Sequence, residues 1–446
     1  MAPTPRVINS HHRLGVFCER SDIITNESTL NQDVDHRITQ WMDSHRSTLV
    51  SLVQQLIQLP SVNAPPLGDE TVAQKMIGHW FRQLGLSVDE YDVCSVDGIK
   101  NHPAWRDLDR NYVGRPNVMA CLPGSGTGRS LVFTGHIDTV ELSEDIAWNH
   151  DPFAGEYDGE SIFGLGAFDM KGGLAAGMMA IRCLVELGVQ CDGTIYLESV
   201  VDEEYGGSNA TLAGRLRYPA IDAAILMEPT NLHIATGHRS TSVWILTVTG
   251  QSSRSFSGEA TTNPARTLID MMQWLGEFLT SRTNQHHGGE SYPWEIDRLH
   301  AGPTSERMGT RIPPTASVIF WVEGGADEDP NIRDQMARWL NERFDASDYE
   351  LRPMIPPLLG SQSASDHPLT RCLQRSMHPW GVEEEPITAP FACDGAMFNR
   401  HSRTPVILFG PEGGNAHGAD EFVRVESVLR LSQVLARTAV AWCGGR

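Results

Sequence analysis

One stretch of the chain decides the fold class: Leu131-Val132-Phe133-Thr134-Gly135-His136-Ile137-Asp138. It has the pattern of a buried strand that runs directly into metal-type ligands. The same order, an apolar strand followed by carboxylates or a histidine, recurs at residues 196–204, 223–228 and 406–417. In open α/β sheets, ligands bind outside the carboxyl ends of the strands. The sequence therefore predicts an α/β fold, a helix-covered and mostly parallel sheet with a metal site at one edge.

A chain of 446 residues is too long for one compact core, so we expect more than one domain. The pattern of strands and helices divides it into three parts. Residues 1–34 are polar and lack the apolar segment of a signal peptide, so we expect an N-terminal extension. Residues 35–237 and 356–446 alternate strands and helices, which predicts one discontinuous, metal-binding catalytic domain. Residues 238–355 follow a β-α-β-β-α-β order, which predicts an inserted α+β domain of ferredoxin-like type.

Two local expectations depend on short signals. Apolar residues at helical spacing predict a single helix over residues 35–59, ended by Pro60. The Gly-rich turn at residues 123–128 lacks the GK[ST] ending of a phosphate loop. It is expected to be a hairpin that joins a strand over residues 117–122 to the 131–135 strand.

The bulk composition narrows the class of partner. The formal net charge of −21 disfavours nucleic acid and anionic membranes, because both require a basic surface. No apolar run reaches the roughly 18 residues of a transmembrane helix. The eight cysteines contain no C-x-x-C pair, which favours reduced thiols and a cytoplasmic location. We therefore expect a small-molecule substrate.

Five residues are candidate ligands of a pair of zinc ions: His136, Asp169, Glu204, Glu228 and His417. In a two-metal site, ions about 3.5–4 Å apart need one bridging ligand, usually a carboxylate. Asp169 suits the bridge because its loop lies between the other ligand-bearing loops. One ion would then bind His136 and Glu228, and the other would bind Glu204 and His417.

Two further acidic residues are candidates for catalytic roles. Asp138 lies two positions beyond His136, where it could accept the second imidazole N–H and fix the tautomer. Glu203 precedes the candidate ligand Glu204, and consecutive side chains point in different directions. Glu203 could therefore stay free to take a proton from water and pass it to a leaving amine, as a general base.

Each candidate also has a purely structural explanation. His136 could be a hydrogen-bonded core histidine, and Glu203-Glu204 a solvated strand end. Asp169 could cap a helix, Glu228 before Pro229 could cap a turn, and His417 could be an ordinary loop residue. All of these explanations would have to hold at the same sheet edge, which favours the metal site.

With these motifs assembled, the chain resembles the co-catalytic zinc amidohydrolases that include acetylornithine deacetylase and succinyl-diaminopimelate desuccinylase, with aminoacylase and carboxypeptidase relatives. The motifs that match are residues 135–140, 148–153, 166–173, 200–204 and 228–230 and the His417 loop. The resemblance implies a zinc exopeptidase-like catalytic domain whose inserted domain serves as a lid and as the contact of a homodimer.

The resemblance also implies the chemistry. His136, Asp169 and Glu228 would bind one zinc, and Asp169, Glu204 and His417 the other. Glu203 would be the general base, and Asp138 would orient His136. The expected reaction is hydrolysis of an N-acyl amide of a small, amino-acid-like substrate. Cobalt or manganese could replace zinc.

The chain departs from the motifs of this family at three places, all of which concern substrate recognition. Where relatives carry a lid histidine that polarises the scissile carbonyl, often across a dimer, this chain has Arg254, whose guanidinium could stabilise an oxyanion. The strand Phe320–Glu323 lacks an arginine often found near it, and Ala396 follows Asp394 where relatives often have Asp-x-Arg. Such arginines bind substrate carboxylates.

The departures leave several functions open. The chain could hydrolyse an unusual amide without a free α-carboxylate near Ala396, or act as a dipeptidase. The scaffold could instead serve amide formation or acyl transfer in a biosynthetic pathway. A non-enzymatic alternative is a zinc-binding assembly module. The presence of Glu203 argues against this last alternative. A protein that has lost its catalytic activity but still binds metal would be expected to keep the five ligands and to lose the general base.

Overall fold

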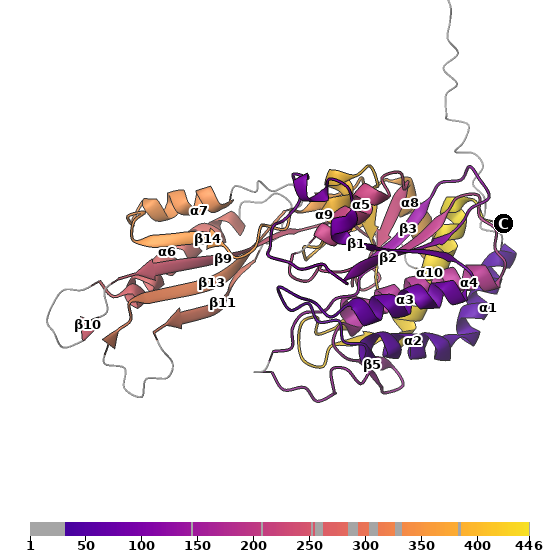
Figure 1. Ribbon diagram of the computed structural model, residues 1–446, viewed down its shortest axis with the longest axis horizontal. Helices are drawn as coiled ribbons and strands as arrows, with labels where there is room; N and C mark the ends of the chain where they lie inside the picture. The colour runs from indigo at the N-terminus through magenta and orange to yellow at the C-terminus, as the bar shows by residue number, and fades with distance from the viewer. Residues whose placement is uncertain are drawn as a thin grey trace, which may run out of the picture.

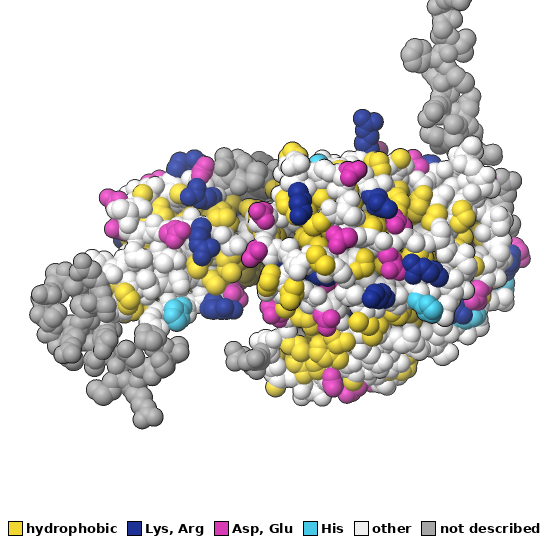
Figure 2. Space-filling view, viewed as in Figure 1, with side chains coloured by type: hydrophobic (Ala, Val, Ile, Leu, Met, Phe, Trp, Pro, Cys, Tyr) yellow, Lys and Arg dark blue, Asp and Glu magenta, His cyan; other side chains and the backbone are white. Residues whose placement is uncertain are grey.

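The computed structural model describes residues 32–143, 146–206, 208–250, 253–254, 262–283, 293–302, 311–325, 332–381 and 385–445. Figure 1 shows a large lobe that holds most of the chain and a small, elongated lobe that extends from one side of it. We call these the main lobe and the small lobe. Acidic and basic side chains are interspersed over the face drawn in Figure 2.

A nine-stranded sheet forms the centre of the main lobe, in the order β1-β2-β6-β3-β7-β17-β8-β15, with β16 paired to β8. The strands are β1 Ser87–Asp92, β2 Pro116–Leu122, β3 Leu131–His136, β6 Ile195–Val200, β7 Ala223–Leu226, β8 Ala235–His238, β15 Ser361–Gln362, β16 Ile387–Ala389 and β17 Val406–Leu408. Its centre, β6-β3-β7-β17, is parallel, and β1, β2 and β15 pair antiparallel on the two sides. The predicted helix-covered sheet is thus confirmed, with its parallel part at the centre.

Helices cover both faces of this sheet (Figure 1). They are α1 Gln32–Ser44, α2 Arg46–Gln58, α3 Thr71–Gln83, α4 Gly172–Glu186, α5 Asn209–Arg217, α8 Pro368–Met377, α9 Gly395–His401 and α10 Val425–Cys443. Helix α4 can approach the sheet closely because its first turns are rich in glycine and alanine. A Cβ at Gly173 would lie 2.2 Å from the Met227 carbonyl oxygen, and one at Gly177 would lie 2.7 Å from the Met227 sulfur.

Short strands complete the main lobe beside the candidate site. β4 Glu156–Tyr157, β5 Ser161–Phe163, β18 Gly413–Gly414 and β19 Phe422–Arg424 form a separate sheet in the order β18-β19-β5-β4. This sheet joins the loop after β17 to the segment before α4, which are far apart in the sequence.

The small lobe is a four-stranded antiparallel sheet with two helices. Its elements in chain order are β9 Ser240–Thr249, α6 Pro264–Thr283, β11 Trp294–Ala301, β13 Thr315–Gly324, α7 Ile332–Asn341 and β14 Tyr349–Pro353. The strand order β11-β13-β9-β14 is that of a ferredoxin-like fold, which confirms the predicted β-α-β-β-α-β insert. Alternate residues of β9 and β13 are buried, because only one face of the sheet packs against helices.

The two lobes have separate hydrophobic cores. The larger core draws on residues between Val34 and Cys443 outside the small lobe, and the smaller one on residues between Trp244 and Leu351. The division expected from the sequence, at residues 237/238 and 355/356, stays a prediction, and His238 at the end of β8 still pairs within the main sheet. The expected extension over residues 1–34 lies almost entirely outside the described residues.

Two local predictions are wrong. The helix expected over residues 35–59 is two helices that meet at His45, whose ring stacks on Trp41 with centroids 3.9 Å apart. The turn at residues 123–128 is not a hairpin, because β6 lies between β2 and β3. Its glycines instead let the chain cross the start of β6, where a Cβ at Gly124 would lie 2.4 Å from the Gly193 carbonyl carbon.

Among the described residues, none of the helices combines the length and the apolar character that spanning a bilayer requires. The seven described cysteines are all free thiols.

Candidate metal centre

The four central strands of the main sheet bring the predicted ligands to one edge. β3 ends at His136, β6 is followed by Glu203 and Glu204, β7 is followed by Glu228, and β17 leads into the loop that holds His417. Because these strands are parallel, their carboxyl ends meet at the same edge. Side chains that are far apart in the sequence therefore converge there.

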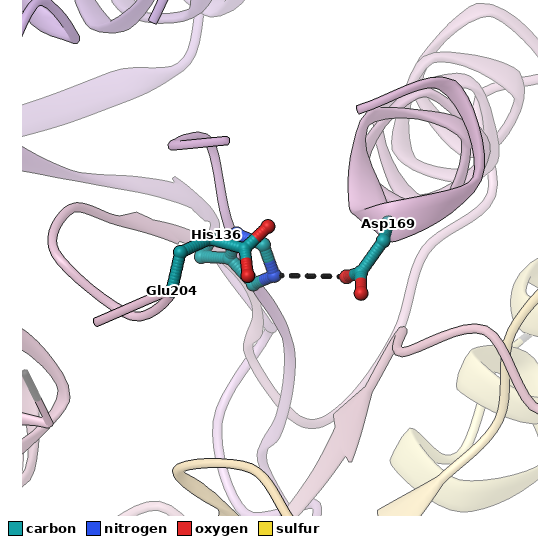
Figure 3. Close-up of side chains that lie close together, drawn as sticks. All are labelled: His136, Asp169 and Glu204. Atoms are coloured by element: carbon teal, nitrogen blue, oxygen red, sulfur yellow. Dashed lines mark hydrogen bonds and ion pairs between the residues drawn. The ribbon is translucent and has the colours of Figure 1, made fainter. Parts of the chain in front are cut away.

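Asp169 lies between the two histidines. Its Oδ1 is 3.2 Å from Nε2 of His136, and its Oδ2 is 3.3 Å from Nε2 of His417. Figure 3 shows the Asp169 carboxylate facing the His136 ring, with Glu204 close by. Each carboxylate oxygen thus faces a different histidine, which is the arrangement that a bridging ligand requires.

The backbone around Asp169 is held by a buried carboxylate. Asp169 lies in the segment η4, Ala167–Lys171, and its peptide bond to Met170 is cis. The Glu421 carboxylate accepts hydrogen bonds from the amides of Gly166 at 2.7 Å and of Phe168 and Asp169 at 2.9 Å each. Burial raises the pKa of Glu421 to about 8, against these hydrogen bonds.

The remaining ligand candidates divide between the two histidines. Nε2 of His417 is 2.9 Å from Glu204 Oε2, and Nε2 of His136 is 3.8 Å from Glu228 Oε1. The His136 side chain is only 1% exposed, whereas that of His417 is 51% exposed. The centre is therefore closed on the His136 side and accessible on the His417 side.

Glu203 faces a second group of acids. Carboxylate oxygens of Glu203, Glu228 and Asp394 lie within 4.8 Å of one another. Burial raises the pKa values of Glu203 and Glu228 well above their usual range, and it raises that of Glu204 as well. Loss of contact with water is the main cause, and the neighbouring carboxylates add to it.

The electrostatics of the histidines complement those of the acids. Glu204 raises the pKa of His417 to about 12. Burial acts to lower the pKa of His136, but Glu228 and Asp169 outweigh it and raise that pKa well above its usual value. The arrangement therefore calls for positive charge between the carboxylates.

This donor set fits a divalent metal. Imidazole nitrogens and carboxylate oxygens are the ligands of zinc and of related ions. Oε1 of Glu228 is buried and has no hydrogen-bond partner in the described part of the chain, as expected of an atom that is reserved for a ligand. A cation would also relieve the repulsion among the acids.

Asp138 contacts both the histidine and the turn after β6. Nδ1 of His136 is 2.9 Å from the Asp138 main-chain oxygen and 3.6 Å from its Oδ1. A hydrogen on Nδ1 leaves the Nε2 lone pair facing Asp169 and Glu228. Asp138 Oδ2 accepts hydrogen bonds from the amides of Glu203 at 2.9 Å and Glu204 at 3.0 Å. The carboxylate thus fixes the turn that carries both glutamates.

Comparison with known proteins identifies this constellation. Residues 132–441 match the sequence profile of Peptidase family M20/M25/M40. The chain belongs to this family. The resemblance inferred from the motifs is thereby confirmed, and the chain is a hydrolase of this metal-dependent, amide-cleaving family.

Curated relatives match nearly the whole chain. The N-formyl-4-amino-5-aminomethyl-2-methylpyrimidine deformylase of Bacillus subtilis is 26% identical over 451 aligned residues, which cover 90% of this chain and 96% of the relative. The succinyl-diaminopimelate desuccinylase of Thioalkalivibrio sulfidiphilus is 25% identical, with 87% and 97% covered. The crystal structure of human carnosine dipeptidase 1 has a TM-score of 0.72 at 16% identity, with 92% and 100% covered. That likeness shows the fold alone.

For this M20/M25/M40 chain, one predicted site residue lies apart from the others. The backbone of Arg254 belongs to β10, Ser253–Arg254, which pairs with β12, Arg311–Ile312. Figure 1 shows β10 at the end of the small lobe that is remote from the main lobe. The side chain of Arg254 lies outside the described residues, so its role stays a prediction.

Sequence reasoning missed several residues that contact the centre of this family member. Glu421 holds the Asp169 loop, and Asn63 donates a hydrogen bond to Asp138 Oδ2 at 2.9 Å. Asp394, noted in the sequence only beside Ala396, lies with Glu203 and accepts a hydrogen bond from Thr211. None of these residues directly follows a strand of the parallel centre, so the signal that pointed to the proposed ligands could not point to them.

Proposed function

We propose that this chain is a two-metal amidohydrolase that removes a small acyl group, such as formyl or acetyl, from the amine of a small molecule. The position of Asp169 between His136 and His417 carries this proposal. His136, Asp169 and Glu228 would hold one ion, and Asp169, Glu204 and His417 the other. Zinc is the proposed metal, and when bound it would polarise the amide carbonyl and lower the pKa of water.

Glu203 is the proposed general base. Its burial and raised pKa suit a group that takes a proton from water and returns it to the leaving amine. Asp138 keeps Glu203 in place through the Glu203 amide, and it orients His136 through the main-chain contact to Nδ1. Asp394 lies beside Glu203 and restricts the space on that side.

The surroundings of Ala396 support an amine without a carboxylate at that point. Ala396 is 1% exposed, in helix α9. One turn later, the Arg400 guanidinium donates to the Gly360 carbonyl at 2.9 and 3.1 Å. Because residue 396 is an alanine, a substrate carboxylate would find no arginine there for a bidentate contact. The similarity to a deformylase of a formylaminopyrimidine favours the same substrate class.

Elemental analysis and an amide panel test this proposal together. The protein is purified without chelator, and N-formyl, N-acetyl and dipeptide amides are offered, each with and without an α-carboxylate. About two metal ions per chain and cleavage of formyl or acetyl amides that lack the carboxylate are expected. Preference for dipeptides would overturn the substrate class. Absence of metal after zinc is supplied would overturn the whole site.

We also propose a homodimer through the small lobe. Helix α6 and the edge strand β11 line an apolar groove of about 820 Å³, whose walls include Ile269, Met272, Trp294, Ile296 and Leu299. Leu299 is 57% exposed and Ile269 is 50% exposed, and surfaces of this kind mark interfaces. In such a dimer, Arg254 of one chain would have a route to the metal centre of the other chain. Light scattering should give a mass in solution of twice the chain mass. The Leu299→Lys variant should have the mass of a single chain.

A further inference from the structure

Arg106 is a buried arginine whose hydrogen bonds go to main-chain carbonyls. Its guanidinium donates to Gly206 at 3.1 Å, to Pro356 at 3.0 Å and to Pro357 at 2.8 Å. Only 9% of the residue is exposed. Burial lowers the pKa of Arg106 to about 10, and Glu203 is the charge that counters this shift. The side chain thus connects two segments that are far apart in the sequence.

The first segment is the turn that carries the proposed general base. The Gly206 amide donates to the Glu203 carbonyl at 2.8 Å, so both residues belong to one tight turn. Gly206 has a φ of 66°, which favours glycine. A Cβ there would lie 3.0 Å from Ile355 and 3.4 Å from Leu358. The turn therefore packs directly against the chain that leaves the small lobe.

The second segment belongs to the connection between the lobes. The chain enters the small lobe at residues 239–241 and leaves it at residues 354–360, through the narrow region between the lobes in Figure 1. We call these residues the linker pair. Thr241 and Leu358 exchange amide hydrogen bonds of 3.0 and 2.9 Å, so the two linkers are joined to each other. Pro356 and Pro357 have no N–H to donate, and their carbonyls bind Arg106.

The backbone of Arg106 is fixed to the main lobe. The Asn209 side chain accepts from the Arg106 amide at 2.9 Å and donates to its carbonyl at 2.8 Å. Asn209 also donates to the Tyr112 hydroxyl at 3.0 Å, and Tyr112 donates to Asp202 at 2.5 Å. Asp202 directly precedes Glu203. Arg106 is therefore anchored through the same network that supports the glutamate turn.

We propose that Arg106 is a positioning residue that couples the orientation of the small lobe to the placement of Glu203. Any reorientation of the lobe must change the backbone of the linker pair. The guanidinium is a planar, rigid fork, so a displacement of Pro356 or Pro357 is passed to Gly206 and from there to Glu203. The inference rests on the proposed role of Glu203 as the base.

Hydrogen exchange of the full-length, metal-loaded chain tests the coupling without a substrate. The variants are Arg106→Gln, which removes the charge, and Arg106→Lys, which keeps the charge but not the fork. Amide exchange should rise together, by about fivefold or more, in peptides that cover residues 203–206 and 354–360. The lysine variant should show a smaller rise. The matched control is Arg37→Gln, because Arg37 also donates to a main-chain carbonyl, that of Leu187 at 2.7 Å, but far from the linkers.

Kinetics supply the second readout. Arg106→Gln should lower kcat by about tenfold or more while KM changes less than about threefold, because a misplaced base affects the transition state more than binding. An exchange increase in only one segment, or an equal increase throughout the chain, would overturn the proposal, as would an effect on KM alone. If Arg106→Gln does not fold, the lysine variant decides. If the wild type cleaves no amide of the panel, the proposed function fails, but the exchange result still decides the coupling.

Discussion

Asn63 is a buried amide between two carboxylates, and its replacement should have a large effect. Its Nδ2 donates to Asp138 Oδ2 at 2.9 Å and to Asp202 Oδ1 at 3.2 Å. Hydrogen bonds to charged groups contribute about 1.5–3 kcal/mol each. Asn63→Ala should therefore lower the free energy of unfolding by about 3–6 kcal/mol, and Asn63→Asp by at least as much, because it places a third carboxylate against the other two.

The activity should fall as well, because Asp138 Oδ2 also holds the amides of Glu203 and Glu204. Urea denaturation of the metal-free variants measures the stability, and kcat with any cleaved amide measures the placement of the base. The matched control is Asn149→Ala, since Asn149 binds Asp420 at 2.5 Å on the exposed surface. Such a pair should contribute less than about 1 kcal/mol. If Asn63→Ala is no more destabilising than Asn149→Ala, the buried amide does not hold the acids together.

Three more outcomes are expected. Glu203→Gln should keep its metal, by elemental analysis, yet lose about 10²-fold or more in turnover; nearly unchanged turnover would refute its role as the base. His417→Ala should bind about one ion per chain rather than two, because Asp169 and Glu204 lose their shared histidine. Burial lowers the pKa of His238 from 6.5 to about 4, so the unfolded chain binds the proton first as the pH falls. The metal-free wild type should therefore lose about 2 kcal/mol more than His238→Gln between pH 7 and pH 5 in urea denaturation. Parallel curves for the two proteins would refute the shift.

The sequence could predict which side chains gather at this edge of the sheet, because the proposed ligands have a local signature. His136 ends a strand of the parallel centre, and Glu204 and Glu228 closely follow two others. The topology of such sheets then brings these residues together. The ferredoxin-like insert was predictable for a similar reason, since its two helices and four strands alternate in a recognised order.

Other features depend on contacts that no local pattern encodes. Asn63 and Arg106 lie in irregular segments, and their partners are up to 251 positions away. The hairpin predicted from the Gly-rich turn is wrong because β6 lies between β2 and β3. The sequence does not say which strands are neighbours in the sheet. At His45 the backbone leaves the helical conformation, with φ −108° and ψ 16°, in a segment whose residue spacing otherwise favours a continuous helix.

The order of the proposed ligands along the chain sets the order in which the two sets of ligands are completed during synthesis. His136, Asp169 and Glu228, which we assign to one ion, all precede β9, where the small lobe begins. His417, which we assign to the second ion, follows Glu228 by 189 positions. At about 5–20 residues per second, the ribosome adds these residues in roughly 10–40 s. The ligands of the first ion are thus synthesised well before those of the second are complete, and a chain interrupted within the small lobe carries a full set for only one of them.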